Sequence, residues 1–244
     1  MNDDPTIGRP AVTVAYAQTL DGRLATATGS SRWISGPESL RFAHELRATQ
    51  DAIMVGAGTV GQDDPRLTVR LVAGRDPLRV VVDSTLRVPP TAAVLADGAA
   101  SGTLFATTPK VPADRRATIE SLGAIVLVLP ADPTGRVDLV ALLADLGARG
   151  IGSLLVEGGA GIITALLRAR LVDRLAVTIA PKILGAGIEA VGDLAIRDLD
   201  RALALTDVRV TPYGPDLVLD GHITYPDAPS SPDVSHAWET SHGQ

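Results

Sequence analysis

The feature that most constrains the fold is a stretch in the second half of the chain where an apolar strand, a glycine-rich turn and a helical pattern follow one another. The apolar run Leu154 to Val156 is followed by a single carboxylate, Glu157, and three glycines within residues 158–161 lead into a helical pattern over residues 160–169. This order predicts a buried parallel strand, a turn whose backbone can approach a ligand closely, and a helix whose first N–H groups face that ligand. A tight turn with a solvated Glu remains the alternative for this motif on its own.

The rest of the chain alternates between strand and helix patterns and becomes β-rich only near its end. Alternation predicts a parallel sheet covered by helices, and the β-rich end predicts an antiparallel edge. We therefore predict an α/β fold in one domain, with a mostly parallel mixed sheet flanked by helices. The predicted strands are residues 11–16, 51–55, 78–82, 103–106, 124–129, 152–156, 174–179, 203–210 and 217–223, and the predicted helices are residues 35–49 with Ser35 as N-cap, a short one after residue 55, 113–122, 138–146 and 160–169.

Composition sets the outer bounds of these predictions. Hydrophobic residues make up 45% of the 244 residues, which is enough for a core, and the polar ends predict a disordered N-terminus (1–8) and a disordered tail (227–244) around one domain over 9–226. No apolar run is long enough to span a membrane, and the N-terminus lacks the features of a signal peptide. We expect a cytoplasmic protein.

Charge and residue types exclude several function classes. The net charge of −6 argues against a nucleic-acid surface, and the absence of cysteine excludes disulfides and thiolate zinc sites. The four histidines show no spacing typical of metal ligands, and His44 within a predicted helix is expected to be packed or solvated. We therefore predict no metal site.

A second glycine motif, residues 56–61, has the GxGxxG pattern and is followed further along the chain by Asp83. Taken alone it matches a dinucleotide-binding fingerprint with its ribose-binding acid, so a Rossmann-type dehydrogenase is one hypothesis. A Rossmann helix would continue past the third glycine, whereas Pro65 cannot lie inside a helix. The glycines are therefore expected to serve a short helix and a substrate loop.

Eight motifs in order resemble the pyrimidine reductase family of riboflavin biosynthesis, over residues 9–225. This family comprises the reductase half of a bacterial deaminase–reductase and the stand-alone archaeal and fungal enzymes, and the resemblance implies a dihydrofolate-reductase-like fold. The motifs are Thr19-Leu-Asp-Gly-Arg-Leu-Ala-Thr-Ala-Thr-Gly, Ser31-Arg-Trp-Ile-Ser, Leu46-Arg-Ala, Gly56-Ala-Gly-Thr-Val, Asp63-Asp-Pro-Arg-Leu-Thr-Val-Arg70, Val82-Asp-Ser, Val156-Glu-Gly-Gly and Ile179-Ala-Pro-Lys-Ile-Leu-Gly.

The resemblance implies an NADPH-dependent reduction, in which hydride reaches the sugar C1′ of a phosphoribosylamino-pyrimidine and leaves a ribitylamino group. It implies a homodimer as well. Carried over by position, Glu157 and Asp63 are the candidate catalytic residues. The implied substrate contacts are Ser31, Arg47, Leu67, Arg70 and Glu157. The implied cofactor contacts are Ala17, Trp33, Thr59, Asp63, Ser84 and the segment Gly159, Ala160, Gly161, Ile162, Ile163, Thr164 and Ala165.

These residue types suit the implied roles. Arg47 and Arg70 carry forked donors that match a phosphate, although a helix-face salt bridge and an exposed loop charge are the plain alternatives. Ser84 can donate to the 2′-phosphate of NADPH, whereas Asp83 on the ribose hydroxyls would favour NAD. Glu157 can accept hydrogen bonds from sugar hydroxyls or ring N–H groups. The sequence does not identify the proton donor.

One position departs from the family pattern. The bacterial two-domain enzymes usually carry a Lys where this chain has Ala15, and no deaminase zinc signature is present. The exact pyrimidine is therefore open. Two further alternatives are a reductase of another pterin- or pyrimidine-like compound and a non-catalytic relative that only binds a nucleotide.

Overall fold

The structure is a computed structural model that describes residues 8–32 and 34–226. Residues 1–7, Trp33 and residues 227–244 lie outside the described part, and with them nearly all of the two predicted disordered ends. The elements are, in chain order, β1 (Ala11–Thr19), β2 (Arg23–Thr26), α1 (Pro37–Ala48), β3 (Ala52–Gly56), α2 (Ala57–Asp63), β4 (Leu78–Val82), the 3₁₀ helix η1 (Ala99–Gly102), β5 (Thr103–Thr107), α3 (Ala113–Ser121), β6 (Ile125–Val128), α4 (Leu139–Ala148), β7 (Ser153–Val156), α5 (Ala160–Arg168), β8 (Arg174–Ala180), β9 (Gly187–Glu189), the 3₁₀ helix η2 (Leu199–Arg201), β10 (Ala204–Tyr213) and β11 (Asp216–Thr224).

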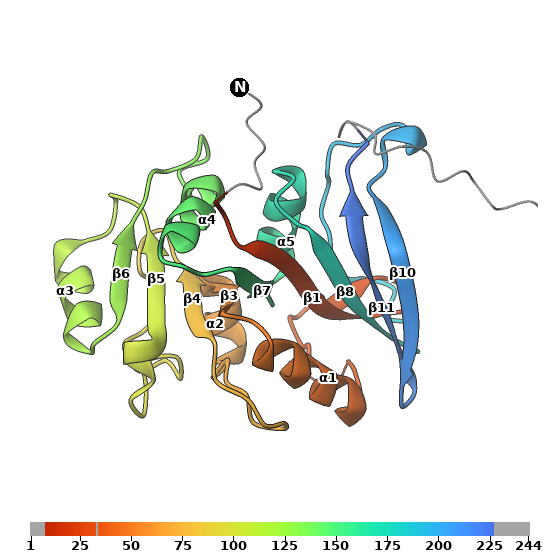
Figure 1. The fold of residues 1–244 in the computed structure, drawn as a ribbon, viewed down its shortest axis with the longest axis horizontal. Coiled ribbons are helices and arrows are strands. Elements are labelled where there is room, and N and C mark those ends of the chain that lie inside the picture. Colours follow the sequence, from red (N-terminus) through yellow and green to blue (C-terminus); the bar gives the residue numbers. More distant parts are fainter. Residues whose placement is uncertain (1–7, 33, 227–244) are drawn as a thin grey trace, which may run out of the picture.

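A nine-stranded sheet forms the centre of the molecule, in the order β10-β11-β8-β1-β7-β3-β4-β5-β6 (Figure 1). From β8 to β6 every neighbouring pair is parallel, while β11 pairs antiparallel with β8, and β10 antiparallel with β11. The predicted α/β class, with a mostly parallel mixed sheet flanked by helices and an antiparallel C-terminal edge, is confirmed.

Both faces of the central strands are buried, because side chains alternate between two hydrophobic clusters. In β3, Ile53 and Val55 pack into a cluster with residues of α1 and α2, whereas Ala52 and Met54 pack into a second cluster with residues of α4 and α5. Figure 1 accordingly shows α1 and α2 apart from α4 and α5. Burial on both faces explains why these strands are continuous apolar runs in the sequence.

The beginning of α1 differs from the sequence prediction. Ser35 is not the N-cap; the helix starts at Pro37, after Gly36, and no side chain of the N-cap closes its first turn. Asp216, at the start of β11, takes that role instead: its Oδ2 accepts a hydrogen bond from the Gly36 N–H at 2.7 Å and one from the Ser39 hydroxyl at 2.7 Å. A carboxylate from a distant strand therefore replaces the local cap.

The short helix predicted within residues 56–65 is confirmed, while the role of the following loop in substrate binding stays a prediction. Helix α2 ends at Asp63, and Asp64 adopts a left-handed conformation with φ 41° directly before Pro65. A seven-residue helix is too short for the Rossmann unit.

No helix in the described part of the chain is long and apolar enough to cross a membrane.

Two short strands, β2 and β9, were not predicted from the sequence. β2 and β9 pair antiparallel as a separate two-stranded sheet, in which the Arg23 guanidinium donates to the Glu189 carboxylate at 2.9 Å. With four and three residues they carry too little periodicity to be recognised. They matter for the site, because Ala25 and Ile188 from these strands line the main cleft.

Candidate functional site

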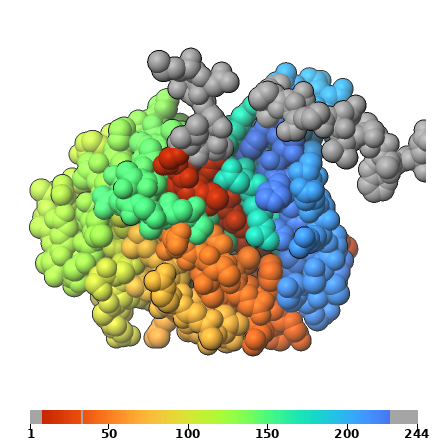
Figure 2. Space-filling view, in the orientation of Figure 1, coloured from red at the N-terminus to blue at the C-terminus, as the bar shows by residue number. Residues whose placement is uncertain are grey.

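A cleft of about 1400 Å³ opens where the carboxyl ends of β1, β3, β4 and β7 meet α1, α2 and the N-terminus of α5. This is the edge at which open α/β sheets bind ligands. Figure 2 shows the orange N-terminal part of the chain between the green middle part and the blue C-terminal strands. Most of the predicted site residues line the cleft, namely Ala17, Ser31, Arg47, Thr59, Asp63, Arg70, Ser84, Glu157, Gly159, Ala160, Gly161, Ile162 and Ala165.

Glu157 and Arg47 form the central ion pair of the cleft. Glu157 follows β7, and Arg47 lies in the last turn of α1. The Arg47 Nε donates to Oε1 at 2.7 Å and Nη2 donates to Oε2 at 2.6 Å, and the side chains are 10% and 18% exposed. Such a bidentate, partly desolvated pair fixes both side chains in one orientation.

The contact with Glu157 stabilises the charged form of Arg47. Burial lowers the pKa of Arg47, but the hydrogen bonds and charge of Glu157 outweigh burial, so the pKa lies above its usual value. A third nitrogen, Nη1, donates to the Thr68 carbonyl at 3.2 Å. Three of the five N–H groups of Arg47 therefore donate within the protein, and its contact with a phosphate stays a prediction.

Arg70 is the more accessible cation. Its side chain is exposed, and its Nη1 donates to the Thr68 hydroxyl at 2.6 Å. Partial burial and the positive charges of Arg47 and Arg66 lower its pKa. A cation held near two others is a favourable place for a dianion.

His44 connects the two arginines and was not predicted to belong to the site. It is 1% exposed, and its Nδ1 accepts a hydrogen bond from the Arg70 backbone N–H at 2.9 Å. Burial first, and then the charges of Arg47 and Arg70, lower the pKa of His44 and favour its neutral form, although Glu157 opposes this shift. The signal that could have revealed this role is its place one helical turn before Arg47.

Three predicted contacts do not have side chains in the cleft. Leu67 is 2% exposed in the core, with φ 54°, and it anchors the loop that carries Arg70. Ile163 is fully buried, and the Thr164 hydroxyl accepts a hydrogen bond from the Gly192 N–H at 2.8 Å. Trp33 lies outside the described residues.

The N-terminus of α5 faces the cleft without a side-chain cap. The Gly159 N–H donates to the Thr59 hydroxyl at 3.2 Å, which ties α5 to α2. A Cβ on Gly158 would lie 3.0 Å from the Cβ of Ile162, so a side chain there would require Ile162 to move. The first N–H groups of a helix without a cap suit a phosphate group.

Ser84 and Asp83 point in different directions. Asp83 is 1% exposed, its Oδ2 accepts from the Val88 N–H at 2.8 Å, and Arg87 lies 3.6 Å from its Oδ1. Asp83 therefore closes a loop and is not among the residues that line the cleft. Ser84 lines the cleft, with its Oγ accepting from the Val137 N–H at 3.2 Å.

Two cations near Ser84 were missed by the sequence analysis. Arg87 and Arg136 line the same part of the cleft, and Arg136 follows a loop in which the Asp132 carboxylate accepts from the Arg136 N–H at 3.0 Å. Arg87 follows Ser84 by three residues and Arg136 by 52 residues. No sequence motif contains both arginines, because only the fold brings their loops together. At the other end of the cleft, the Ser31 hydroxyl donates to the Asp63 carboxylate at 3.3 Å.

Ala15 and Ala17 form part of the wall of the cleft that belongs to β1. Ala15 presents only a methyl group to the cleft, at the position where the resemblance implies a Lys. Within residues 8–32 and 34–226, no group of three histidine or acidic side chains comes together as a metal site.

The chain is similar in sequence to RibD proteins and to a stand-alone reductase. The RibD C-terminal domain family matches residues 10–219. The riboflavin biosynthesis protein RibD of Aquifex aeolicus is 41% identical over 212 residues, which are 86% of this chain and 57% of that protein. The 2,5-diamino-6-ribosylamino-4(3H)-pyrimidinone 5′-phosphate reductase of Methanothermobacter thermautotrophicus is 42% identical over 84% of this chain and 98% of its own length.

Solved structures agree with this result. RibD of Acinetobacter baumannii has a TM-score of 0.77 at 28% identity, over 89% of this chain and 59% of that one. The riboflavin biosynthesis reductase of Saccharomyces cerevisiae has a TM-score of 0.70 at 26% identity, over 89% and 91%. This chain thus spans little more than half of these RibD relatives and nearly all of the two reductases from Methanothermobacter thermautotrophicus and Saccharomyces cerevisiae.

Proposed function

Because the chain belongs to the RibD C-terminal domain family, we propose that it is an NADPH-dependent reductase of riboflavin biosynthesis. Its substrate would be a 5-phosphoribosylamino-pyrimidine, whose ribosylamino group becomes a ribitylamino group. The observation that carries the proposal is one cleft that joins the Glu157–Arg47 pair, Arg70 and the uncapped N-terminus of α5.

On the substrate side, we assign the phosphate to Arg70, with Arg47 as the charge behind it. Arg47 holds the Glu157 carboxylate at 2.6–2.7 Å, so its main role is to position Glu157. The carboxylate retains lone pairs that can accept from sugar hydroxyls or ring N–H groups. Ser31 and the backbone near Leu67 complete the proposed substrate contacts.

On the cofactor side, the pyrophosphate would lie at the N–H groups from Gly159 onward, where the helix end favours an anion. Thr59, Asp63 and Ala17 line the cleft between this point and the substrate side. Ser84, Arg87 and Arg136 supply donors and charge for a 2′-phosphate, and the buried Asp83 offers no competing contact with the ribose. This arrangement supports NADPH over NADH.

The bound cofactor supplies the hydride. The residues of this chain provide alignment, which carries most of the rate in such transfers. Glu157 holds the sugar through its hydroxyl groups, and the Arg47 contact prevents the carboxylate from turning away. Asp63, hydrogen-bonded to Ser31, would restrain the loop between the two ligands.

A homodimer in the cytoplasm completes the proposal. Strand β10 is at the edge of the sheet, and Val208 and Val210 are exposed on it. Soluble proteins usually cover such a strand, and a second copy of the chain can do so. The absence of cysteine is compatible with a reducing compartment.

Product analysis tests the proposed function. The enzyme is incubated with NADPH and either the deaminated or the non-deaminated phosphoribosylamino-pyrimidine, and the product mass is measured. A gain of two hydrogens with one of them supports the proposal and identifies the pyrimidine. Binding of NADPH without a product from either pyrimidine would point to a non-catalytic relative. Reduction of a pterin, with no reduction of either pyrimidine, would point to another pathway.

A further inference from the structure

Thr178, near the end of β8, is a buried polar residue of the cleft whose hydroxyl has no partner among the described residues. The residue lines the cleft and is 7% exposed. Within residues 8–32 and 34–226 its hydroxyl makes no hydrogen bond, and the one fully buried side-chain oxygen without a partner is Asp83 Oδ1. The Thr178 oxygen is therefore reached from the cleft. Because buried polar groups usually have a partner, an open hydroxyl here indicates a contact with a ligand.

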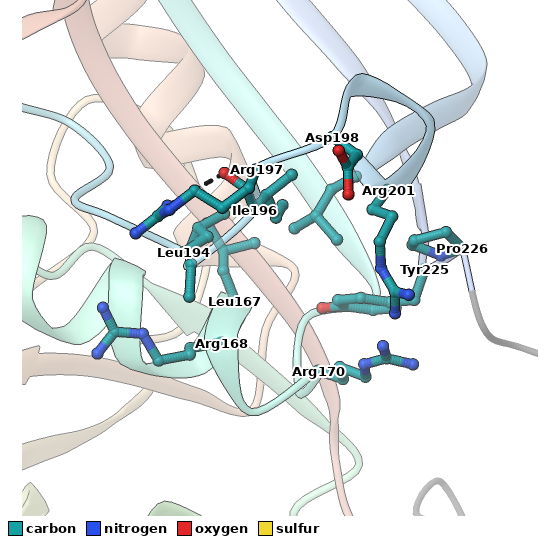
Figure 3. A pocket seen from close by; sticks show the side chains of 12 residues that line it. Leu167, Arg168, Arg170, Leu194, Ile196, Arg197, Asp198, Arg201, Tyr225 and Pro226 are labelled. Atoms are coloured by element: carbon teal, nitrogen blue, oxygen red, sulfur yellow. Dashed lines mark hydrogen bonds between the residues drawn. The ribbon is translucent and has the colours of Figure 1, made fainter.

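A second cavity, of about 390 Å³, shows the contrast at the other end of α5 (Figure 3). Arg168 and Arg197 contribute to its lining, and both are held by Asp193. The Asp193 carbonyl accepts from Arg168, and its carboxylate accepts twice from Arg197 at 2.8 Å. These donors serve the structure of the protein itself, whereas the hydroxyl of Thr178 has no such partner in the described part of the chain.

Thr178 lies on the face of the sheet that carries Glu157. It is paired with Ala17 of β1, and residues paired across neighbouring strands point to the same side. Ala17 follows Ala15 by two residues, and Ala15 packs in the same hydrophobic cluster as Leu155 of β7. Glu157 comes two residues after Leu155. The alternation of side chains therefore places Thr178 and Glu157 on one face, the face that we assign to the substrate.

The register of the strands sets the separation between these two residues. Val14 of β1 pairs with Val156 on one side and with Leu175 on the other. Glu157 is therefore two residues short of the level of Thr178. Two strand spacings of about 4.8 Å and two residues of about 3.3 Å give a Cα separation of about 12 Å. This span suits a ligand that has its sugar at Glu157 and its ring over β1.

The floor of the cleft between Glu157 and Thr178 is built from small residues. Ala15, Ala17 and Ala176 line the cleft there. Their methyl groups can contact the face of a flat ring, but they offer no hydrogen bond to its edge. The Thr178 hydroxyl can both donate and accept. A mostly apolar surface with one polar group at its end is an arrangement that orients a small ligand.

We propose that the Thr178 hydroxyl hydrogen-bonds the polar edge of the pyrimidine ring of the substrate, while the ring lies on the alanine floor and the sugar remains at Glu157. Thr178 is then a specificity residue of the cleft and takes no part in hydride transfer. This proposal rests on the proposed function, because it needs a pyrimidine substrate on this face of the sheet. A hydroxyl can pair with a ring carbonyl or with an exocyclic amine, so both candidate pyrimidines fit.

Calorimetric titration in saturating NADP⁺, which cannot supply hydride, tests this contact. The ligands are the two phosphoribosylamino-pyrimidines and ribose 5-phosphate, which lacks the ring. Thr178→Val is near-isosteric and removes the hydroxyl, so the pyrimidine should bind about five- to fiftyfold more weakly, because its polar edge loses a partner. Binding of ribose 5-phosphate should stay within about twofold. Thr178→Ser keeps the hydroxyl and should restore most of the affinity.

The matched control is Thr13→Val on β1. Thr13 is also 7% exposed and lies two residues before Ala15 on the same face, but it is not among the residues that line the cleft. Its substitution should leave the affinity for every ligand unchanged. Melting temperatures show whether each variant is folded; valine is favoured in strands, and Thr178→Ala replaces Thr178→Val if that variant does not fold.

Loss of pyrimidine affinity in Thr178→Val, with recovery in Thr178→Ser and no loss in Thr13→Val, supports the contact. Unchanged pyrimidine affinity in Thr178→Val, an equal loss for ribose 5-phosphate, or an equal loss in Thr178→Ser would overturn it.

The proposed function is judged separately, from product formation with NADPH. If the wild type reduces the pyrimidine and Thr178→Val binds it unchanged, the reductase function stands and only the Thr178 contact is wrong. If the wild type binds the pyrimidine without reducing it, the reductase function is wrong, and the affinities still decide the contact. A wild type that binds neither pyrimidine overturns both.

Discussion

At the residue scale, the ion pair formed by Glu157 and Arg47 is the centre of the proposed site. The two residues are 110 positions apart, and each had a separate role in the sequence interpretation. The sequence indicated both residues, because each belongs to a recognisable motif. It could not show that the Glu157 carboxylate accepts hydrogen bonds from Arg47. The pairing supports our proposal that Arg47 positions Glu157 and that Arg70 binds the phosphate.

Glu157→Gln tests this assignment. The amide adds donors where Arg47 and the substrate also donate, so kcat/KM should fall about ten- to a thousand-fold, or about 1.4–4 kcal/mol. The free energy of unfolding should fall by about 1–3 kcal/mol, less than for a fully buried pair, because both side chains keep some exposure. Steady-state kinetics and thermal unfolding measure the two effects.

The control is Asp220→Asn, which weakens another ion pair, with Arg174 Nε at 2.7 Å, on β8 and β11. It should lower stability and leave kcat/KM per folded molecule unchanged. If Glu157→Gln behaves in the same way, Glu157 is structural.

His44 predicts a pH dependence of stability. Its pKa is lowered from 6.5 in the folded protein by burial, Arg47 and Arg70, although Glu157 opposes this shift. The unfolded chain therefore binds a proton at a higher pH than the folded one, so stability falls as the pH drops below about 6.5. His44→Asn keeps an acceptor for the Arg70 N–H but does not titrate. The melting temperature should fall less for this variant than for the wild type between pH 7 and 5; parallel curves would contradict the assignment.

Ser84→Asp should weaken NADPH binding by about 1–3 kcal/mol, since a carboxylate would repel the 2′-phosphate and a donor is lost. Binding of NADH should change much less. Fluorescence titration measures the affinities for both cofactors. An equal loss of affinity for NADPH and NADH would show that Ser84 does not contact the 2′-phosphate.

At the element scale, the sequence predicted what local periodicity encodes. The long strands and α3, α4 and α5 were located to within a few residues, because apolar runs and helical faces are local patterns. The structure differs where distant residues decide the outcome: Asp216 replaces Ser35 at the start of α1, and β2 pairs with β9 across more than 160 residues. Leu67 likewise belongs to a loop motif, yet its side chain is in the core.

The contact between α5 and the turn before it supplies a prediction for this element. Gly158→Ala would place a Cβ 3.0 Å from Ile162 Cβ, so α5 must shift and the affinity for NADPH should fall severalfold. Gly61→Ala is the matched control, since no atom lies within 4 Å of its added Cβ. Cofactor titration of both variants measures the effect, and equal affinities would show that the position of α5 is not critical.

At the scale of the whole molecule, the exposed edge strand β10 predicts self-association. Light scattering should give about twice the 25.2 kDa mass of the chain. Val210→Glu, on β10, should produce a monomer, whereas Val140→Glu, on α4 with the same 58% exposure, should not. A monomeric wild type, or equal behaviour of the two variants, would refute a dimer through β10.

The proposed function requires this cleft to bring a hydride donor to the sugar carbon of a phosphoribosylamino-pyrimidine. The most direct measurement is transfer of label from NADPH deuterated at both C4 positions, with the product examined by NMR. We expect one deuterium at C1′ of a ribitylamino product, and a strongly reduced rate for Glu157→Gln. A folded protein that binds NADPH but gives no transfer, or transfer to a ring carbon of the pyrimidine, would contradict it.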